Sequence, residues 1–294
     1  MPKTDLSRRE ALFTVASSVL PAPALPTAKF GPHTISRLIV GGNPVSANSH
    51  VSAQLSREML DYFTTGQVKK LLRDCEQAGI NVWQSRGDRH IQRLLHEYRL
   101  EGGRIEWIAQ TASEYGDLSR NIGEIGSLKP LGIYFHGAAT DRHWVAGTID
   151  RVPEALKAIR QTGAMVGLGT HIPEVIDYAE DKGWDVDFYM ACVYNLSRSR
   201  AEAERLAGRP VGELFWDPDR ERMLERVQKT RKPCLIFKVY AATRKCDAPE
   251  QMRDALALVF RYAKPSDAVV IGMFPKHTDQ IRENCRLVVE TGRR

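Results

Sequence analysis

Seven polar residues follow short apolar runs at regular places along this chain of 294 residues. They are Asn43, Gln84, Gln110, His136, His171, Asn195 and Lys238. Neutral amides, two imidazoles and one ammonium suit a sugar-like or other polar small molecule, which is held by many hydrogen bonds. Histidine and buried lysine also transfer protons near neutral pH, so His136 and Lys238 are candidates for an acid and a base.

These side chains can act together only if the apolar runs end at one place. The runs cover residues 38–40, 80–83, 105–109, 131–135, 165–168, 186–192, 235–237 and 268–271. Each is short and bounded by glycine, proline or polar residues, which is typical of buried strands. The stretches between them have helical periodicity, for example at Met252, Ala255, Leu256 and Val259.

Strands that alternate with helices indicate a parallel sheet. Eight such units predict a closed (β/α)8 barrel, the TIM barrel, whose site lies at the carboxyl ends of the strands. A doubly wound dinucleotide-binding sheet is disfavoured, because Gly167 and Gly169 follow the fifth strand and Ile172 stands where a third glycine is needed. The connection from 196 to 233 is the longest, and we expect helices within it.

The composition disfavours several classes of protein and partner. Five cysteines without a CxxC pair disfavour a disulfide scaffold and a zinc ribbon, and Cys192 and Cys234 lie in apolar strands, where we expect core positions. The net charge of +6 comes without a basic run with interleaved aromatics, so nucleic acid is not an expected partner. No apolar run reaches the roughly 20 residues of a membrane span.

The first 28 residues have the pattern of a bacterial export signal: a charged start, a short apolar stretch and small residues at Ala22, Ala24 and Ala28. The Ser7-Arg8-Arg9 segment resembles a twin-arginine signal. We therefore expect an export signal over 1–28, cleaved near Ala24 or Ala28, and a barrel domain over 29–294. The twin-arginine machinery would then deliver the folded protein to the periplasm or outside the cell. The alternative is a disordered basic tail on a cytoplasmic protein.

Several segments, in their order along the chain, resemble aldo-keto reductases. They are Phe30-Gly-Pro-His-Thr-Ile-Ser-Arg-Leu-Ile-Val-Gly-Gly-Asn-Pro44, Ala78-Gly-Ile-Asn-Val-Trp83, Ile133-Tyr-Phe-His136, Val193-Tyr-Asn195, and Gly272 with Gln280-Ile-Arg-Glu-Asn284. The resemblance implies a barrel with a small hairpin closing its floor. It also implies an oxidoreductase that uses NADP(H) on a sugar-like or other polar carbonyl or hydroxyl compound.

The resemblance carries residue roles with it. It implies that His136 is catalytic and that Tyr194 stacks on the nicotinamide. The cofactor's adenosine phosphate would lie at Gly272, Lys276, Gln280 and Asn284, with Arg282 beside them.

The chain departs from the family at three of four catalytic positions. The family's Asp, Tyr and Lys are replaced by Gln84, a segment without tyrosine before Tyr98, and Gln110-Thr111. Tyr115, on a rim loop, is a candidate for a displaced proton donor, and Trp144 is a candidate stacking surface for the substrate.

Two other classes of function therefore stay open. One is a non-redox lyase or isomerase with His136 and Lys238 as acid and base, and the other is a binding protein that kept the pocket. We expect no metal; a metal site would need His136 and His171 together with Asp141 or Glu174.

Overall fold

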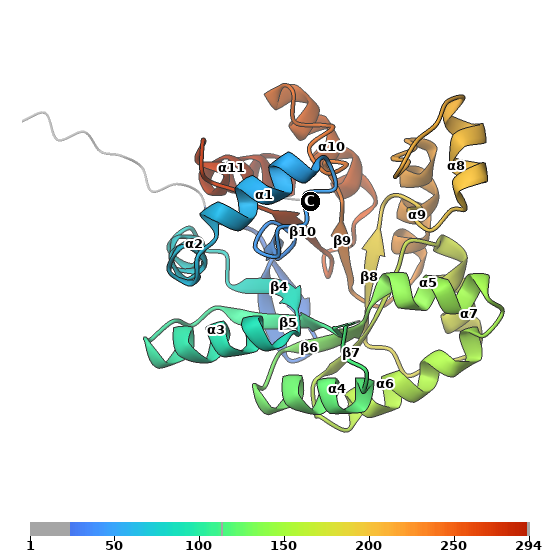
Figure 1. The fold of residues 1–294 in the computed structure, drawn as a ribbon, viewed down its shortest axis with the longest axis horizontal. Coiled ribbons are helices and arrows are strands. Elements are labelled where there is room, and N and C mark those ends of the chain that lie inside the picture. The colour runs from blue at the N-terminus through green and yellow to red at the C-terminus, as the bar shows by residue number, and fades with distance from the viewer. Residues whose placement is uncertain (1–23, 113, 293–294) are drawn as a thin grey trace, which may run out of the picture.

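The structure is a computed structural model that describes residues 24–112 and 114–292. Eight parallel strands close into a barrel in the order β10-β3-β4-β5-β6-β7-β8-β9 (Figure 1). Their bounds are β3 Leu38–Gly41, β4 Val82–Arg86, β5 Glu106–Gln110, β6 Gly132–Phe135, β7 Met165–Thr170, β8 Phe188–Cys192, β9 Cys234–Phe237 and β10 Ala268–Gly272. The eight predicted strands and the (β/α)8 fold are confirmed. Residues 1–23 of the predicted export segment lie outside the described residues.

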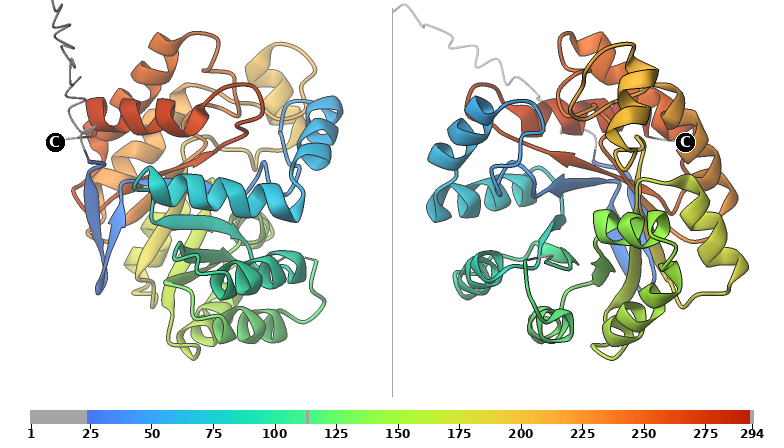
Figure 2. Two further views of the ribbon diagram at one scale, coloured as in Figure 1. Left: turned by 90° about the vertical axis from the view of Figure 1, so that its left-hand side faces the viewer. Right: turned by 45° about the vertical axis from the view of Figure 1, so that its right-hand side comes forward.

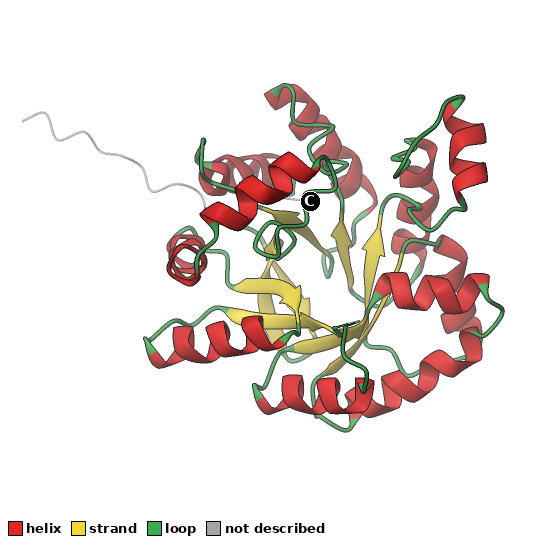
Figure 3. Ribbon diagram, viewed as in Figure 1, coloured by secondary structure: helices red, strands yellow, loops and turns green. Residues whose placement is uncertain are grey.

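Helices surround the barrel on its outer side, as the red ribbons around the yellow strands in Figure 3 show. They are α1 Ala53–Tyr62, α2 Thr65–Gln77, α3 Arg89–Leu100, α4 Leu118–Ser127, α5 Gly137–Val145, a short 3-10 helix at Ile149–Arg151, α6 Val152–Arg160, α7 Pro173–Asp181, α8 Arg200–Ala207, α9 Pro218–Lys229, α10 Pro249–Tyr262 and α11 Gln280–Thr291. The connection from β8 to β9 contains α8 and α9, as expected. None of the helices in the described residues is both long and apolar enough to cross a membrane.

A hairpin closes one end of the barrel. Strands β1 (Thr27–Phe30) and β2 (His33–Ser36) pair antiparallel, and the left view of Figure 2 shows them at the end opposite to α1 and α8. Phe30 and Ile35 are fully buried, and the Phe30 ring lies 4.9 Å from the ring of Phe188 inside the barrel. The expected floor hairpin is confirmed, and the opposite end is the one that is left for a site.

Strand alternation divides the core into two layers. Side chains such as Ile39, Ile108 and Met190 fill the barrel, while their neighbours on each strand pack against the helices. Gly167 makes room in the inner layer, because a Cβ there would lie 2.3 Å from the Phe188 ring and 2.5 Å from Cβ of Tyr134. A glycine in β7 thus allows two large aromatic side chains to share the barrel interior.

Candidate active site at the carboxyl ends of the strands

The ends of β4, β5 and β6 carry a neutral hydrogen-bonded group deep in the barrel. Gln84 donates from Nε2 to the hydroxyl of Tyr134 at 2.8 Å, and that hydroxyl donates to Oε1 of Gln110, also at 2.8 Å. Burial raises the pKa of Tyr134, so the phenol stays protonated. Both predicted substrate-binding amides are therefore held by a tyrosine that the sequence analysis did not single out.

His136 follows β6 and completes this side of the mouth. Its backbone N–H donates to Oγ1 of Thr111 at 3.0 Å, while its buried Nδ1 has no hydrogen-bond partner among the described residues. Burial, with smaller contributions from the nearby His171 and Arg142, lowers the pKa of His136 to about 4. The imidazole is neutral at pH 7 and can offer a hydrogen bond to a ligand without carrying charge. We refer to Gln84, Gln110, Tyr134 and His136 as the neutral cluster.

The end of β7 carries ionisable groups that form an ion pair, in contrast to the uncharged groups of the neutral cluster. Nδ1 of His171, just after β7, lies 2.6 Å from Oδ2 of Asp141, whose carboxylate is 1% exposed. The same carboxylate accepts hydrogen bonds from the hydroxyls of Thr170 and Ser197, both at 2.6 Å, and from the backbone N–H of His171. Burial alone would lower the pKa of His171, but the interactions with Cys192 and Asp141 outweigh it and raise that pKa to about 10.

Lys238 follows β9 and lies in an unusual loop. Its φ is +65°, and Ala241, Ala242 and Thr243 also have positive φ, a conformation that costs roughly 1–2 kcal/mol for each residue with a side chain. The guanidinium of Arg244 donates to the carbonyls of Ala241 and Ala242 and so fixes the loop. Such strain is concentrated at functional sites in proteins.

The electrostatic surroundings of Lys238 also favour a chemical role. Burial lowers its pKa to about 8, although Cys192 and Glu213 act in the opposite direction. Its Nζ lies 5.7 Å from the centre of the Phe215 ring. We refer to Asp141, His171, Cys192 and Lys238 as the charged cluster.

The two clusters meet because β6, β7, β8 and β9 are neighbours in the barrel. In register, Thr170 of β7 lies opposite Ala191 of β8, and Cys192 of β8 lies opposite Phe237 of β9, so His171, Cys192 and Lys238 lie at adjacent strand ends. The structure therefore brings His136, His171 and Lys238 together, as the sequence predicted from their positions at strand ends. Neither Tyr134 nor the role of Asp141 was predicted from the sequence. Cys192 was expected to be a core residue, and it is fully buried.

The remaining predicted substrate-binding residues, and the predicted proton donor Tyr115, contact protein groups outside the two clusters. The exposed Asn43 lies 3.4 Å from Nε2 of His50, and Asn195 accepts from the backbone N–H of Ser197 and so supports the Ser197 hydroxyl. Trp144 packs edge-on against Tyr178 at 5.6 Å, between α5 and α7. The Tyr115 hydroxyl donates to Glu124 of α4 at 3.0 Å. The polar ends or rings of these side chains are thus already in contact with protein groups.

The residues predicted for NADP(H) are mostly engaged within the protein. Tyr194 is fully buried, with the Phe215 ring 5.2 Å from its own. Gln280 accepts from the backbone N–H of Phe274, and Asn284, 2% exposed, accepts from Tyr240. In this arrangement the residues do not fit a nicotinamide stacked on Tyr194, because Phe215 packs against that ring.

Two further predicted positions lie near the same end of the chain. A Cβ on Gly272 would lie 2.8 Å from Pro44, so this glycine serves close packing in the structure. Lys276 pairs with Glu58 at 2.8 Å and keeps 39% of its side chain exposed. Lys276 is therefore accessible to an anion in a way that Gln280 and Asn284 are not.

The residues considered for a metal are otherwise occupied. Asp141 is bound to His171 and Ser197, and Glu174 pairs with Arg222 at 2.6 Å. Across residues 24–112 and 114–292, no three His, Cys, Asp or Glu side chains lie together as metal ligands would.

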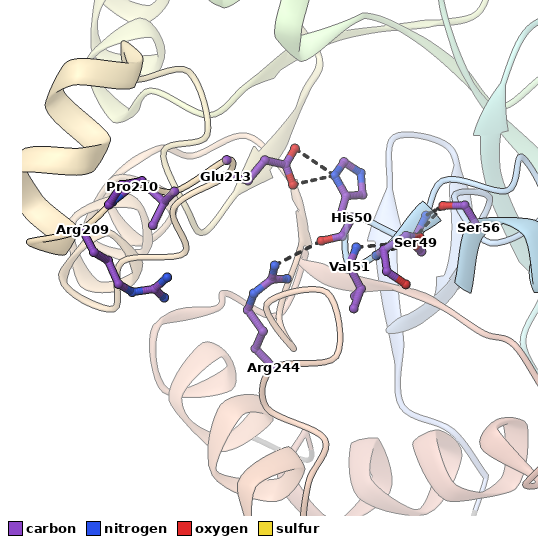
Figure 4. Close-up of a pocket in the computed structure, with 11 residues that line it drawn as sticks. Ser49, His50, Val51, Ser56, Arg209, Pro210, Glu213 and Arg244 are labelled. Carbon is purple, nitrogen blue, oxygen red and sulfur yellow. Dashed lines mark hydrogen bonds and ion pairs between the residues drawn. The ribbon is translucent and has the colours of Figure 1, made fainter. Parts of the chain in front are cut away.

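Loops that follow β3, β8 and β9 form a pocket of about 560 Å³ at the same end of the barrel (Figure 4). His50 and Glu213 point toward one another across it, with Nδ1 and Oε2 2.9 Å apart, and Arg244 donates to the carbonyl of His50 at 3.2 Å. Glu213 also interacts electrostatically with Lys238. The pocket is therefore next to the charged cluster and offers hydroxyl, imidazole and guanidinium groups to a polar ligand.

The fold and these strand ends define the class of the protein, a (β/α)8 barrel with polar and ionisable side chains at the usual site of that fold. No protein-family model and no curated protein sequence matches the chain. Solved structures do match. A truncated 3-deoxy-D-arabino-heptulosonate 7-phosphate synthase from Thermotoga maritima has a TM-score of 0.53 at 11% identity, over 92% of each chain. The glycerol dehydrogenase AKR11B4 from Gluconobacter oxydans, an aldo-keto reductase, has a TM-score of 0.51 at 11% identity, over 90% of this chain and 94% of that one. At these identities the likeness establishes the barrel fold alone.

Proposed function

We propose that this chain is a barrel enzyme that moves a proton on a small, sugar-like carbonyl or hydroxyl compound, as a non-redox lyase or isomerase. The observation that carries the proposal is Lys238, a half-buried lysine on a strained loop at the barrel mouth, whose pKa is lowered to about 8 by partial burial. A lysine that titrates near neutrality can take a proton from carbon or oxygen and return it.

His136 has a different part in this proposal. Because its pKa is lowered to about 4, it does not serve as a strong base. A neutral imidazole with a free ring nitrogen can donate a hydrogen bond to a carbonyl oxygen and polarise it, as neutral histidines do in other barrels. Lys238 then transfers the proton while His136 holds the oxygen.

The test follows the exchange of substrate C–H hydrogens with deuterium from solvent, by NMR, over a panel of small hydroxyaldehydes, hydroxyketones and sugars without nicotinamide. We expect catalysed exchange whose rate rises with pH to an inflection near 8. Lys238→Met and His136→Gln should each lose about a hundredfold or more, and the losses should not add in the double variant. Lys229→Met, a change of an exposed lysine on α9, is the control. Wild-type rates in both single variants would refute the proposal.

A second candidate is the NADP(H)-dependent oxidoreductase that the sequence resemblance implies. It is supported by a groove of about 1460 Å³ between α2 and α11, whose lining includes Lys70, Lys276, Arg282 and Arg286 as well as Asp74, Asp279 and Glu290. A phosphate-bearing ligand would bind these cations in competition with their carboxylate partners. NADPH should then raise the melting temperature by mass action, and no shift at millimolar NADPH or NADH would reject this candidate.

We further propose export through the twin-arginine machinery to the periplasm or the outside of the cell. Strand β1 begins at Thr27 and Ala28 is 3% exposed, so cleavage after Ala24 would leave the floor hairpin whole, whereas cleavage after Ala28 would remove half of β1. Amino-terminal sequencing of the exported protein distinguishes the two sites. Unchanged export after Arg8→Lys with Arg9→Lys would remove the twin-arginine proposal.

A further inference from the structure

The pocket between the loops after β3, β8 and β9 is lined by two arginines that pair with no carboxylate of the described residues. Arg209, in the segment after α8, forms neither a hydrogen bond nor an ion pair within that part of the chain, and Figure 4 shows its guanidinium extending toward Arg244. Arg244 donates to backbone carbonyl oxygens. Other arginines between β8 and β9 do pair with carboxylates: Arg198 with Asp219, Arg200 with Glu204, and Arg222 with Glu174.

The carboxylate that lines this pocket is held by an imidazole. Nδ1 of His50 lies 3.0 Å from Oε1 and 2.9 Å from Oε2 of Glu213, so the carboxylate pairs with His50 and with neither guanidinium. One carboxylate faces two guanidinium groups among the described lining residues. The pocket therefore keeps an excess of positive charge whether or not His50 is protonated.

Contacts with three loops fix the guanidinium of Arg244. In the loop after β9 it donates from Nη1 to the carbonyls of Ala241 at 3.1 Å and Ala242 at 3.3 Å. It donates from Nη2 to the carbonyl of His50 at 3.2 Å, and it lies over the ring of Phe215 at 4.2 Å. A guanidinium carries several N–H donors in a rigid fork. The N–H of Nε and one N–H of Nη2 therefore stay available to a ligand in the pocket.

The ring of Phe215 connects this pocket with the proposed catalytic lysine. Nζ of Lys238 lies 5.7 Å from the centre of the ring, and the guanidinium carbon of Arg244 lies 4.2 Å from the same centre. The two cationic groups are therefore no farther apart than the sum of these distances, roughly 10 Å. A small molecule with an anionic group at one end can contact Arg244 and Lys238 at the same time.

We propose that this pocket binds the phosphate group of a phosphorylated, sugar-like carbonyl compound whose carbonyl end lies at Lys238. A phosphate carries about 1.5 to 2 negative charges at pH 7, which match the two guanidinium groups, and its oxygens accept paired hydrogen bonds from arginine. A carboxylate carries a single charge and would leave one guanidinium without a counterion. The placement of the carbonyl rests on the proposed function, whereas phosphate binding does not.

The position of the pocket also sets it apart from the phosphate sites of other barrels. Those sites are frequently formed by the loops after the seventh and eighth strands. Here β10 is the eighth strand of the barrel, and no described residue after it lines the pocket. The loops after the first, sixth and seventh strands would hold the phosphate instead.

Isothermal titration calorimetry of the full chain measures the binding of dihydroxyacetone phosphate, of dihydroxyacetone and of glycerate, which carries a carboxylate in place of a phosphate. We expect dihydroxyacetone phosphate to bind at least about tenfold more tightly than the other two, because hydrogen bonds between guanidinium and phosphate are charge-assisted. Arg209→Gln and Arg244→Gln should each weaken its binding about tenfold and leave that of dihydroxyacetone unchanged. Arg205→Gln, a change of an exposed arginine on α8 that does not line the pocket, is the control.

The two arginine variants answer different questions. Arg244 also holds the loop after β9, so Arg244→Gln can weaken binding by changing the loop. Arg209 has no such contact within the described residues, so Arg209→Gln tests the charge alone and keeps the proposal testable if the other variant does not fold. Equal affinity for dihydroxyacetone phosphate and dihydroxyacetone, tighter binding of glycerate, or unchanged affinity in Arg209→Gln would overturn the proposal. An equal loss in Arg205→Gln would do the same.

The result is separate from that of the deuterium-exchange test, because calorimetry needs no turnover. Selective binding of dihydroxyacetone phosphate without catalysed exchange would support the phosphate site and reject the lysine-based chemistry. Catalysed exchange without any preference for the phosphorylated compound would support that chemistry and reject the phosphate site.

Discussion

The neutral cluster and the charged cluster occupy adjacent parts of one barrel mouth, but their buried polar groups are stabilised in different ways. In the neutral cluster, Tyr134 and two glutamines satisfy one another with hydrogen bonds between uncharged groups. In the charged cluster, a carboxylate and an imidazole are buried as a pair. Burying a fully hydrogen-bonded network of uncharged groups costs little free energy and makes the site rigid, whereas a buried charge is strongly destabilising unless each of its partners is present. The difference indicates that the neutral cluster shapes the cavity and the charged cluster supplies reactive groups.

The two histidines give the largest expected contrast, because each pKa unit corresponds to about 1.4 kcal/mol. The folded pKa of His171, about 10, exceeds the usual value of 6.5, so the stability it contributes is complete below pH 6.5 and is lost as the pH rises through 10. The folded pKa of His136, about 4, lies below the same usual value. Its contribution is complete above pH 6.5 and is lost as the pH falls through 4.

Chemical denaturation at a series of pH values measures both effects. We expect His171→Gln to flatten the alkaline side of the stability curve and leave the acid side in place, and His136→Gln to do the reverse. If each variant changed both sides equally, the opposite protonation of the two histidines would be disproved.

Removing the carboxylate of the charged cluster should cost about 3–5 kcal/mol of unfolding free energy, because Asp141→Ala removes the acceptor of a largely buried imidazolium, of the buried Thr170 hydroxyl and of the half-buried Ser197 hydroxyl. Urea denaturation gives the value. Asp185→Ala is the control, since Asp185 is 64% exposed in its pair with Arg160 and should cost less than about 1 kcal/mol. Equal losses in the two variants would contradict the buried-pair description.

Breaking the neutral cluster should cost less. Tyr134→Phe leaves the amides of Gln84 and Gln110 without the hydroxyl between them, for a loss of about 1–3 kcal/mol in the same assay. Tyr178→Phe, which removes an exposed hydrogen bond to Asp150, should stay within about 0.5 kcal/mol. The Tyr134→Phe variant should still catalyse exchange of substrate C–H hydrogens with solvent deuterium. Complete loss of this exchange would indicate that Tyr134 takes part in the chemistry and does not only shape the cavity.

The smallest effect is expected outside both clusters. Tyr115 donates to Glu124 on the outer helix α4, so Tyr115→Phe should change stability by no more than about 0.5 kcal/mol and leave exchange unaltered. A tenfold or greater fall in the exchange rate would restore Tyr115 as the displaced proton donor that its position on a rim loop suggested.

The sequence by itself determined the architecture. Short apolar runs alternate with amphipathic stretches eight times, and only a closed barrel buries eight such strands with helices on one side. This pattern also located the strand ends, and hence His136, His171 and Lys238, because parallel strands all point their carboxyl ends the same way. These inferences depend on local periodicity, which a sequence displays directly.

Only the tertiary structure decided what each of these residues does. Nothing near His136 or His171 in the sequence distinguishes a neutral imidazole from a charged one; the difference arises because Asp141, on a helix 30 residues earlier, reaches His171 while Nδ1 of His136 is buried without a hydrogen-bond partner among the described residues. From the sequence, Gln84 and Gln110 are predicted to bind a ligand through their amides. In the structure, the hydroxyl of Tyr134, from a third strand, lies between them and hydrogen-bonds to both. Protonation and hydrogen bonding depend on contacts between distant segments, and those contacts exist only after the barrel has closed.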